Sequence, residues 1–167
     1  MTPVAIALGS NVGDSLEHLR KSVARLRRVI VVDKVSSVYR TAPMYVEDQS
    51  PFLNAVLVGT TDLGPRSLLN ALKEIEGKVG RQERDRYGPR EIDLDLISYG
   101  SLRYEFIGGD KPLIVPHPRT PERRFVLVPL SEIAPGLRLI GLGTTAELLD
   151  QTIGQTDDVV RLDNAQL

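Results

Sequence analysis

The chain has 167 residues, of which 41% are hydrophobic and 26% charged, and its formal net charge is −1. This length and composition fit one globular domain with a buried core, and the near-neutral charge argues against a nucleic-acid or membrane-surface protein, because both carry strongly basic faces. Cysteine is absent and only two histidines are present, His18 and His117. This excludes disulfides, thiol nucleophiles and thiolate zinc sites. With no basic leader and no long apolar run at its start, the chain is expected to be cytoplasmic.

The first half of the chain predicts alternating strands and helices. Residues 4–8 form a short apolar run that ends at Gly9-Ser10-Asn11 and predict a buried strand. A helix capped by Asp14 is predicted next, since apolar residues recur along one face as far as Leu26. Strands are predicted at 35–40 and 54–60. The connection between them, 43–52, is too long for a tight hairpin and is a candidate functional loop.

The second half completes a recognisable order of elements. Gly64-Pro65 opens a second predicted helix, which ends near Gly80, and a strand is predicted at 92–97. The order β-α-β-β-α-β predicts an α+β, ferredoxin-like sandwich with an antiparallel sheet covered by two helices. Additional C-terminal helices are predicted around 124–133 and 146–149. We therefore expect a single domain in residues 1–155 and a polar tail, 156–167, that frays.

Two carboxylates stand on one side of the predicted strand at 92–97. In this segment the apolar residues 92, 94 and 96 share one face, so Asp93 and Asp95 share the other. Residues two apart on a strand lie roughly 6.5–7 Å apart at Cα, so both side chains can reach one cation or a close pair of cations. An all-oxygen donor set favours Mg²⁺, which usually accompanies phosphate. The alternative is that both aspartates form only the solvated face of a half-buried strand.

An arginine-rich loop precedes these carboxylates. Arg81, Arg84, Arg86 and Arg90 surround the Gly88-Pro89 turn, and a second basic group, Arg119, Arg123 and Arg124, follows His117. The planar guanidinium suits phosphate oxygens, so these groups are candidates for binding a polyanion. A solvated, self-neutralised loop is the alternative. The segment Gly9–Gly13 lacks the pattern of a P-loop and is interpreted as a turn.

Several motifs together resemble one known family. The chain resembles 6-hydroxymethyl-7,8-dihydropterin pyrophosphokinase, above all in the block from Tyr87 to Ile97, where Gly88-Pro89-Arg90 precedes Asp93-Leu94-Asp95. The other matching segments before it are Gly9-Ser10-Asn11, Arg40-Thr41-Ala42-Pro43 and Phe52-Leu53-Asn54. The resemblance continues through Pro116-His117 and Arg123-Arg124-Phe125, and covers residues 4 to about 150 in order. It implies a ferredoxin-like enzyme of folate biosynthesis that transfers the terminal diphosphate of ATP to the hydroxymethyl oxygen of the pterin and releases AMP.

The resemblance also implies roles for individual residues. Asp93 and Asp95 would hold two Mg²⁺ ions on the phosphates of ATP, the co-substrate, while Arg81 and Arg90 would serve the phosphates and the reacting oxygen. The pterin pocket would be formed by Thr41, Pro43, Phe52, Asn54 and Phe125, with the two rings on either face of the bicycle. The ATP contacts would come from Glu76, Arg84, Arg90, His117 and Arg123, and either Glu83 or Arg84 could be the second loop contact. We expect a monomer that binds neither nucleic acid nor membrane.

Two other functional classes fit the element order. A ferredoxin-like RNA-binding module would need the aromatic RNP pattern on the sheet strands and a basic net charge; these strands do not show that pattern, and the net charge is −1. A non-catalytic sensor of Mg²⁺-nucleotide would keep the arginines and both aspartates without turnover. The two rings Phe52 and Phe125 could also be core packing instead of pocket walls.

Overall fold

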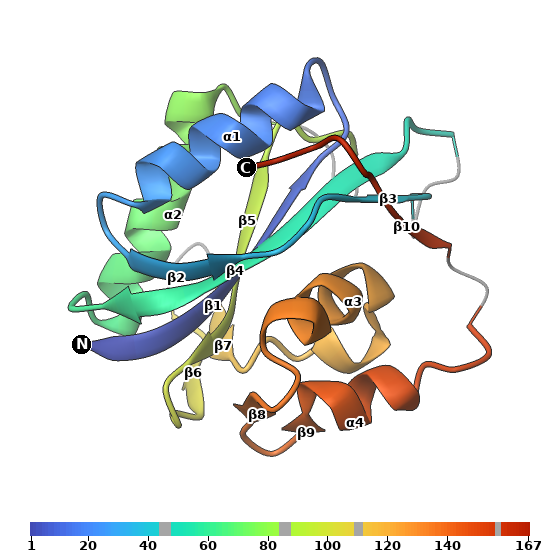
Figure 1. Ribbon diagram of the computed structural model, residues 1–167. Helices are drawn as coiled ribbons and strands as arrows, with labels where there is room; N and C mark the ends of the chain where they lie inside the picture. Colours follow the sequence, from blue (N-terminus) through green and yellow to red (C-terminus); the bar gives the residue numbers. More distant parts are fainter. Residues whose placement is uncertain (44–47, 84–87, 109–111, 156–157) are drawn as a thin grey trace.

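A six-stranded antiparallel sheet forms the centre of the computed structural model (Figure 1). The structure describes residues 1–43, 48–83, 88–108, 112–155 and 158–167. The strand order is β10-β3-β4-β1-β5, and β2 also pairs with β4. The sheet strands are β1 (Thr2–Ser10), β2 (Val31–Val35), β3 (Tyr39–Thr41), β4 (Phe52–Thr61), β5 (Asp93–Tyr99) and β10 (Val159–Arg161).

The helices cover both faces of this sheet. In Figure 1, α1 and α2 lie on one side and α3 and α4 on the other. Their bounds are α1 (Ser15–Leu26), α2 (Pro65–Val79), α3 (Arg124–Ile133) and α4 (Thr145–Asp150), with a 3₁₀ turn at Thr120–Glu122. Two small hairpins complete the described part of the chain, β6 (Tyr104–Phe106) with β7 (Leu113–Val115) and β8 (Arg138–Leu139) with β9 (Gly143–Thr144). The ferredoxin-like prediction is confirmed.

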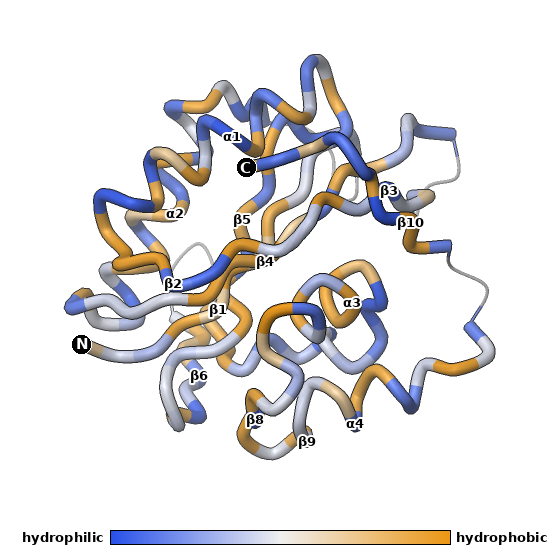
Figure 2. Tube along the Cα trace, in the orientation of Figure 1, coloured by the Kyte–Doolittle hydropathy of each residue, from blue (hydrophilic) through white to orange (hydrophobic). Residues whose placement is uncertain are grey.

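The central strand β1 is buried on both faces. Val4, Ile6 and Leu8 belong to the core under α1 and α2. Ala5 and Ala7 alternate with them and belong to the core under α3. The small alanines leave room for α3 to pack against the sheet. Figure 2 shows the resulting run of hydrophobic residues near the labels of β1 and β4 in the middle of the sheet.

Apolar burial holds the helices to the sheet. Leu19, Leu68 and Leu72 are fully buried in the core between these helices and the sheet. Each such side chain contributes about 1.5–3 kcal/mol, whereas an exposed ion pair such as Lys21–Glu17 contributes about 0–1 kcal/mol. The helix ends follow the sequence signals: Asp14 accepts from the backbone N–H of Glu17, and Gly80 ends α2 with a φ of 118°.

Two features differ from the sequence predictions. The strand predicted at 35–40 is divided into β2 and β3, because Ser36 interrupts the ladder: its hydroxyl oxygen accepts from the N–H of Val56 at 2.9 Å. The tail predicted to fray is ordered over Val159–Arg161, which forms β10 against β3. The prediction was wrong because periodicity does not show that β3 offers a free edge.

Candidate active site

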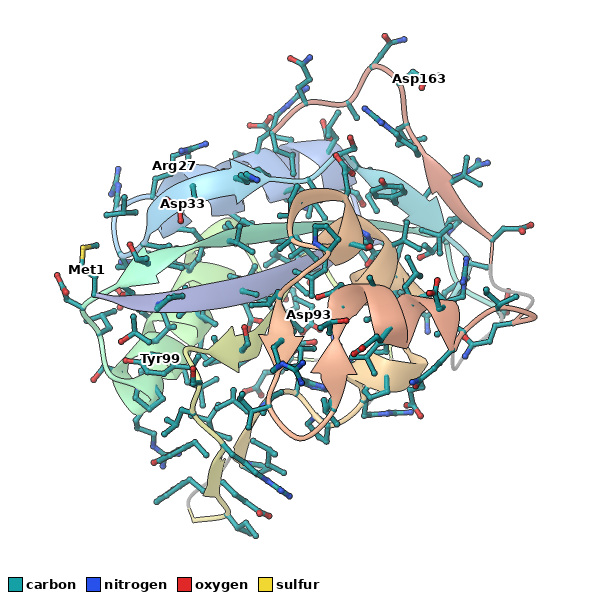
Figure 3. All side chains as sticks on the ribbon, turned by 60° about the horizontal axis from the view of Figure 1, so that its bottom comes forward. Met1, Arg27, Asp33, Asp93, Tyr99 and Asp163 are labelled. Carbon is teal, nitrogen blue, oxygen red and sulfur yellow. The ribbon has the colours of Figure 1, made fainter. Side chains whose placement is uncertain are left out.

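One cavity of about 260 Å³ collects most of the residues that the sequence singled out. It lies where β1, β3, β4 and β5 meet the start of α3. Its walls include Thr41, Pro43, Phe52, Asn54, Arg81, Arg90, Asp93, Asp95, His117, Arg123 and Phe125. Of the candidate site residues, Glu76 is not in the wall and Arg84 lies outside the described part of the chain. Figure 3 places Asp93 near the centre of the view, with Met1 and Asp163 at its periphery.

Asp93 and Asp95 project into this cavity from β5. Leu94 between them points into the apolar core on the opposite face. Asp93 accepts from Nη1 of Arg81 at 2.6 Å, and Asp95 accepts from Nη1 of Arg123 at 3.3 Å. Burial and the charge of Asp93 raise the pKa of Asp95 to about 6, although the charges of Arg123 and Lys73 lower it. Two carboxylates that line the same partly buried cavity form an anionic centre suited to cations.

The donor set fits Mg²⁺ bound together with phosphate. Within the described residues, no group of three or more histidine, cysteine, aspartate or glutamate side chains could hold a metal by itself. Mg²⁺ is commonly bound by one or two carboxylates, with waters and substrate phosphates as the other ligands. Asp93 and Asp95 supply these two carboxylates, so the pair fits a metal that arrives with a polyphosphate.

Glu76 lies behind the carboxylate pair. Its side chain is 2% exposed, and its Oε1 accepts from the backbone N–H of Leu94 at 2.7 Å. It also pairs with Nη1 of Arg81 at 2.8 Å and with Nζ of Lys73 at 3.0 Å. Because Leu94 separates the two aspartates, these contacts fix the position of both. The ATP contact expected of Glu76 stays a prediction, and the geometry gives this residue a positioning role.

Arg81 is held between two acidic groups. Burial alone would lower the pKa of Arg81, but the charges of Asp93 and Glu76 raise it above its ordinary value. The guanidinium is therefore permanently charged, and it lies at the cavity wall beside the carboxylates. Such a group can neutralise negative charge on a bound phosphate.

His117 is a neutral side chain at the cavity wall. Burial and the charge of Arg123 lower the pKa of His117 to about 4. Its Nδ1 accepts from the backbone N–H of Arg119 at 3.3 Å, so the proton of the neutral ring resides on Nε2. His117 can therefore donate one hydrogen bond at neutral pH. Next to it, the buried Nε of Arg123 has no hydrogen-bond partner among the described residues.

The other wall of the cavity is aromatic and polar. Phe52 begins β4 and Phe125 lies in the first turn of α3, so the two rings come from different layers. Between the strands, Nδ2 of Asn54 donates to Oγ1 of Thr41 at 2.7 Å, and both side chains are 5% exposed. Gly9 keeps this wall open, since a Cβ there would lie 3.2 Å from Oδ1 of Asn54. Two rings with an amide and a hydroxyl suit a flat, polar heterocycle.

Asn11 is a residue that sequence reasoning assigned only to a turn. Its Oδ1 accepts from the backbone N–H of Arg90 at 2.8 Å, and its Nδ2 donates to Oε1 of Gln49 and to the carbonyl of Ser50, both at 3.1 Å. The side chain is 6% exposed. The available signal was the Gly-Ser-Asn sequence after a buried strand, where an amide can bond neighbouring backbone.

Comparison with known proteins identifies the family. The model of the 7,8-dihydro-6-hydroxymethylpterin-pyrophosphokinase (HPPK) family matches residues 5–135. The chain belongs to this family. A pyrophosphokinase named 2-amino-4-hydroxy-6-hydroxymethyldihydropteridine pyrophosphokinase from Bacillus subtilis is 46% identical over 130 residues, which are 77% of this chain and 75% of that protein. The protein of the same name from Aquifex aeolicus is 42% identical over 137 residues, 82% of this chain and 83% of the relative.

Other relatives are much longer than this chain. The mitochondrial folate synthesis bifunctional protein of Arabidopsis thaliana is 48% identical over 131 residues, which are 78% of this chain but 23% of that protein. The chain thus spans about a quarter of the length of such bifunctional relatives. A crystal structure of Plasmodium falciparum HPPK-DHPS superimposes with a TM-score of 0.77 at 13% identity, over 91% of this chain and 45% of that one. This likeness concerns the fold. Within the described residues, none of the helices is both long and apolar enough to span a membrane.

Proposed function

We propose that this protein transfers the terminal diphosphate of ATP to the hydroxymethyl oxygen of 6-hydroxymethyl-7,8-dihydropterin, giving the pterin diphosphate and AMP in folate biosynthesis. One observation carries the proposal: paired carboxylates, charged arginines and two aromatic rings line the same cavity. The family membership supports the same reaction.

The reaction needs positioning and charge neutralisation more than covalent catalysis. The hydroxymethyl oxygen forms a bond to the β-phosphorus of ATP, the bond from that phosphorus to the α-phosphate oxygen breaks, AMP leaves, and the hydroxyl proton is released. Charge is spread over phosphate oxygens throughout, so fixed cations stabilise the transition state. We assign Arg81 and Arg90 to this task and to alignment of the reacting oxygen.

Asp93 and Asp95 would hold the metal, which we propose to be two Mg²⁺ ions. When bound, Mg²⁺ neutralises phosphate charge and lowers the pKa of a hydroxyl that it ligates. Glu76 fixes the position of both carboxylates by accepting a hydrogen bond from the backbone N–H of Leu94, which lies between them. The supporting observation is the donor chemistry of the pair, which suits a cation that brings its other ligands with it.

The remaining residues divide between the two substrates. Phe52 and Phe125 would enclose the pterin ring, while Thr41, Pro43 and Asn54 would line its edge. Neutral His117 would donate to ATP, and Arg123 would pair with its phosphates, with Arg84 as a further contact beyond the described residues.

A coupled assay for AMP tests the reaction. Purified protein should form AMP from ATP only when both Mg²⁺ and 6-hydroxymethyl-7,8-dihydropterin are present. The matched control is 6-methyl-7,8-dihydropterin, which has the same ring but lacks the reacting oxygen and should give no AMP. A non-catalytic Mg²⁺-nucleotide sensor would bind ATP and release none. Formation of ADP instead of AMP would exclude diphosphate transfer.

Other expectations from the sequence belong to the same proposal. We propose a monomer with one pyrophosphokinase domain in residues 1–155 and a terminal segment, 156–167, whose described part is docked on it. The partners would be ATP and the pterin alcohol, with no nucleic acid and no membrane. The cytoplasmic location stays a prediction from the sequence.

A further inference from the structure

The end of the chain lies outside the part matched by the family model. That match stops at residue 135, whereas the described chain continues through α4 to a last segment, residues 158–167. In Figure 1 this segment runs from β10 at the edge of the sheet toward α1, where the C-terminus lies. We call residues 158–167 the C-terminal strap.

The strap extends the sheet beside the cavity. Val159 pairs with Thr41 and Arg161 with Tyr39, and the backbone N–H of Leu162 donates to the carbonyl of Val38 at 2.9 Å. On its other side β3 pairs with β4, where Thr41 lies opposite Phe52. Val159, Thr41 and Phe52 thus form one row across three strands. Because β3 has only three residues, its position depends on both neighbours.

The far end of the strap is anchored on α1 and the core. Nε of Arg20 donates to the carbonyl of Gln166 at 2.9 Å. Leu162, Ala165 and Leu167 pack against the core under α1 and α2. These contacts bury apolar surface at three points, so the strap is held independently of β3.

The strand β3, which the strap extends, is also bonded to α3. The hydroxyl of Tyr39 donates to Oε2 of Glu132 at 2.6 Å, and the backbone N–H of Ser37 donates to Oε1 at 3.0 Å. Arg161 of the strap pairs with Tyr39 in the ladder, so its charge lies within electrostatic reach of Tyr39 and Glu132. Strap, β3 and α3 therefore meet at one junction, and α3 carries Phe125.

We infer that the C-terminal strap is a positioning element for the pterin side of the cavity: it fixes β3, and through β3 the Thr41–Asn54 pair and the junction with α3. This inference rests on the proposed function, which makes that wall the pterin site. ATP would be affected little, because Asp93, Asp95 and His117 lie on β5 and the loop before α3, away from the strap's partner strand.

Val160→Pro in the full chain tests the strap directly. Hydrogen-bonded pairs alternate along an antiparallel ladder, so the bond between Leu162 and Val38 places the N–H of Val160 opposite the carbonyl of Arg40. Proline removes this N–H. The side chain of Val160 is 45% exposed, so Val160→Ala is the matched control for the lost side chain.

The readout is the Kd of each substrate by calorimetry, with 6-hydroxymethyl-7,8-dihydropterin titrated in the presence of α,β-methylene-ATP and Mg²⁺. Val160→Pro should weaken pterin binding about fivefold, equal to about 1 kcal/mol, and change the Kd of the ATP analogue less than about twofold. Val160→Ala should resemble the parent. Unchanged pterin affinity, or an equal loss for both ligands, would overturn the inference.

A second pair of variants covers the case in which Val160→Pro does not fold. Arg161 is exposed, so Arg161→Glu should fold, and it places a negative charge beside Glu132. It should weaken pterin binding about two- to threefold, whereas Arg161→Lys keeps the charge and the affinity. Equal affinities of the Glu and Lys variants would contradict the positioning role.

Hydrogen exchange tests the positioning role of the strap separately from the proposed function. In the ligand-free protein, the amides of Tyr39–Thr41 should exchange at least about tenfold faster in Val160→Pro than in Val160→Ala. This measurement needs no substrate. A parent protein that binds no pterin would refute the proposed function. An unchanged exchange rate of the β3 amides in Val160→Pro would refute the positioning role of the strap.

Discussion

Asn11 and Arg90 exchange two hydrogen bonds across the cavity rim. The backbone N–H of Arg90 donates to Oδ1 of Asn11 at 2.8 Å, and the backbone N–H of Asn11 donates to the carbonyl of Arg90 at 2.9 Å. The amide nitrogen of the same side chain reaches Gln49 and Ser50. One buried side chain therefore joins the end of β1, the Arg90 segment and the segment before β4.

Asn11→Ala should lower kcat/KM for the proposed reaction about ten- to hundredfold. It leaves the N–H of Arg90 without its partner, which costs about 1–3 kcal/mol, and releases Arg90 from the position in which we propose that it binds phosphate. Gln49→Ala removes one of the Asn11 contacts and should have a smaller effect. Steady-state kinetics with both substrates varied would measure the difference. Equal activities of the two variants would show that Asn11 shapes a turn and nothing more.

Asp93→Ala and Asp95→Asn should abolish most of the AMP formation while the protein stays folded. Both side chains line the cavity, and neither belongs to the apolar core, so thermal unfolding should change by only a few degrees. Loss of a metal ligand should cost several kcal/mol in the transition state, and about 1.4 kcal/mol corresponds to tenfold in rate. Calorimetric titration with Mg²⁺ and an ATP analogue should show weakened metal-dependent binding. Near-parental AMP formation by either variant would refute the metal site.

Phe52→Ala and Phe125→Ala test the aromatic wall. Each ring contact is worth about 0.5–1.5 kcal/mol beyond area burial, so the pterin Kd should rise about 2- to 12-fold in either variant. The Kd of ATP should change little for Phe52→Ala. Phe125 also packs against the core under α3, so Phe125→Leu is the matched control that retains apolar volume. If both ligands weaken together and the melting temperature falls, the rings are core packing.

The periodic and motif-bearing parts of the fold could be predicted from the sequence. The apolar faces of α1 and α2 follow directly from their spacing, and the alternation at Asp93-Leu94-Asp95 correctly separates core from cavity. The split between β2 and β3 could not be predicted, because it depends on the hydroxyl of Ser36 bonding to Val56, which is distant in sequence. Strand β10 was missed for a similar reason, since a strand of three residues has no readable period.

The candidate site shows the same division. Residues with charge or rings in an unusual local pattern could be singled out, and nearly all of them line one cavity. Contacts with backbone groups could not be predicted: Asn11 bonds to Arg90, 79 positions away, and Glu76, which was expected to contact ATP, accepts from the N–H of Leu94. Such contacts depend on which backbone donors the fold brings near, and a sequence pattern carries no information about them.

The last prediction concerns the junction of Tyr39 and Glu132 at high pH. Burial, the hydrogen bond to Glu132 and the charge of Glu132 together raise the pKa of Tyr39 from 10.0 to about 12. The unfolded chain, with the ordinary pKa, therefore releases the phenol proton first, so the contribution of Tyr39 to stability is complete below pH about 10 and is lost as the pH rises toward 12. Tyr39→Phe has no such proton. At pH about 8 the variant should be less stable by about 1.5–3 kcal/mol, because a hydrogen bond to a carboxylate is lost.

The difference between parent and Tyr39→Phe should shrink as the pH rises. At pH about 11 the ionised phenol stabilises the unfolded parent by about 1.4 kcal/mol, while the folded parent keeps the neutral form. Urea unfolding of both proteins at pH about 8 and about 11 would measure this, since the other titrating groups are the same in both and cancel in the comparison. Glu132→Gln serves as a control, because it keeps a hydrogen-bond acceptor but removes the charge. In this background, the stability difference caused by adding Tyr39→Phe should depend less on pH. A stability difference that is the same at both pH values would mean that Tyr39 titrates normally in the folded protein, and that the bond to Glu132 does not hold β3 against α3.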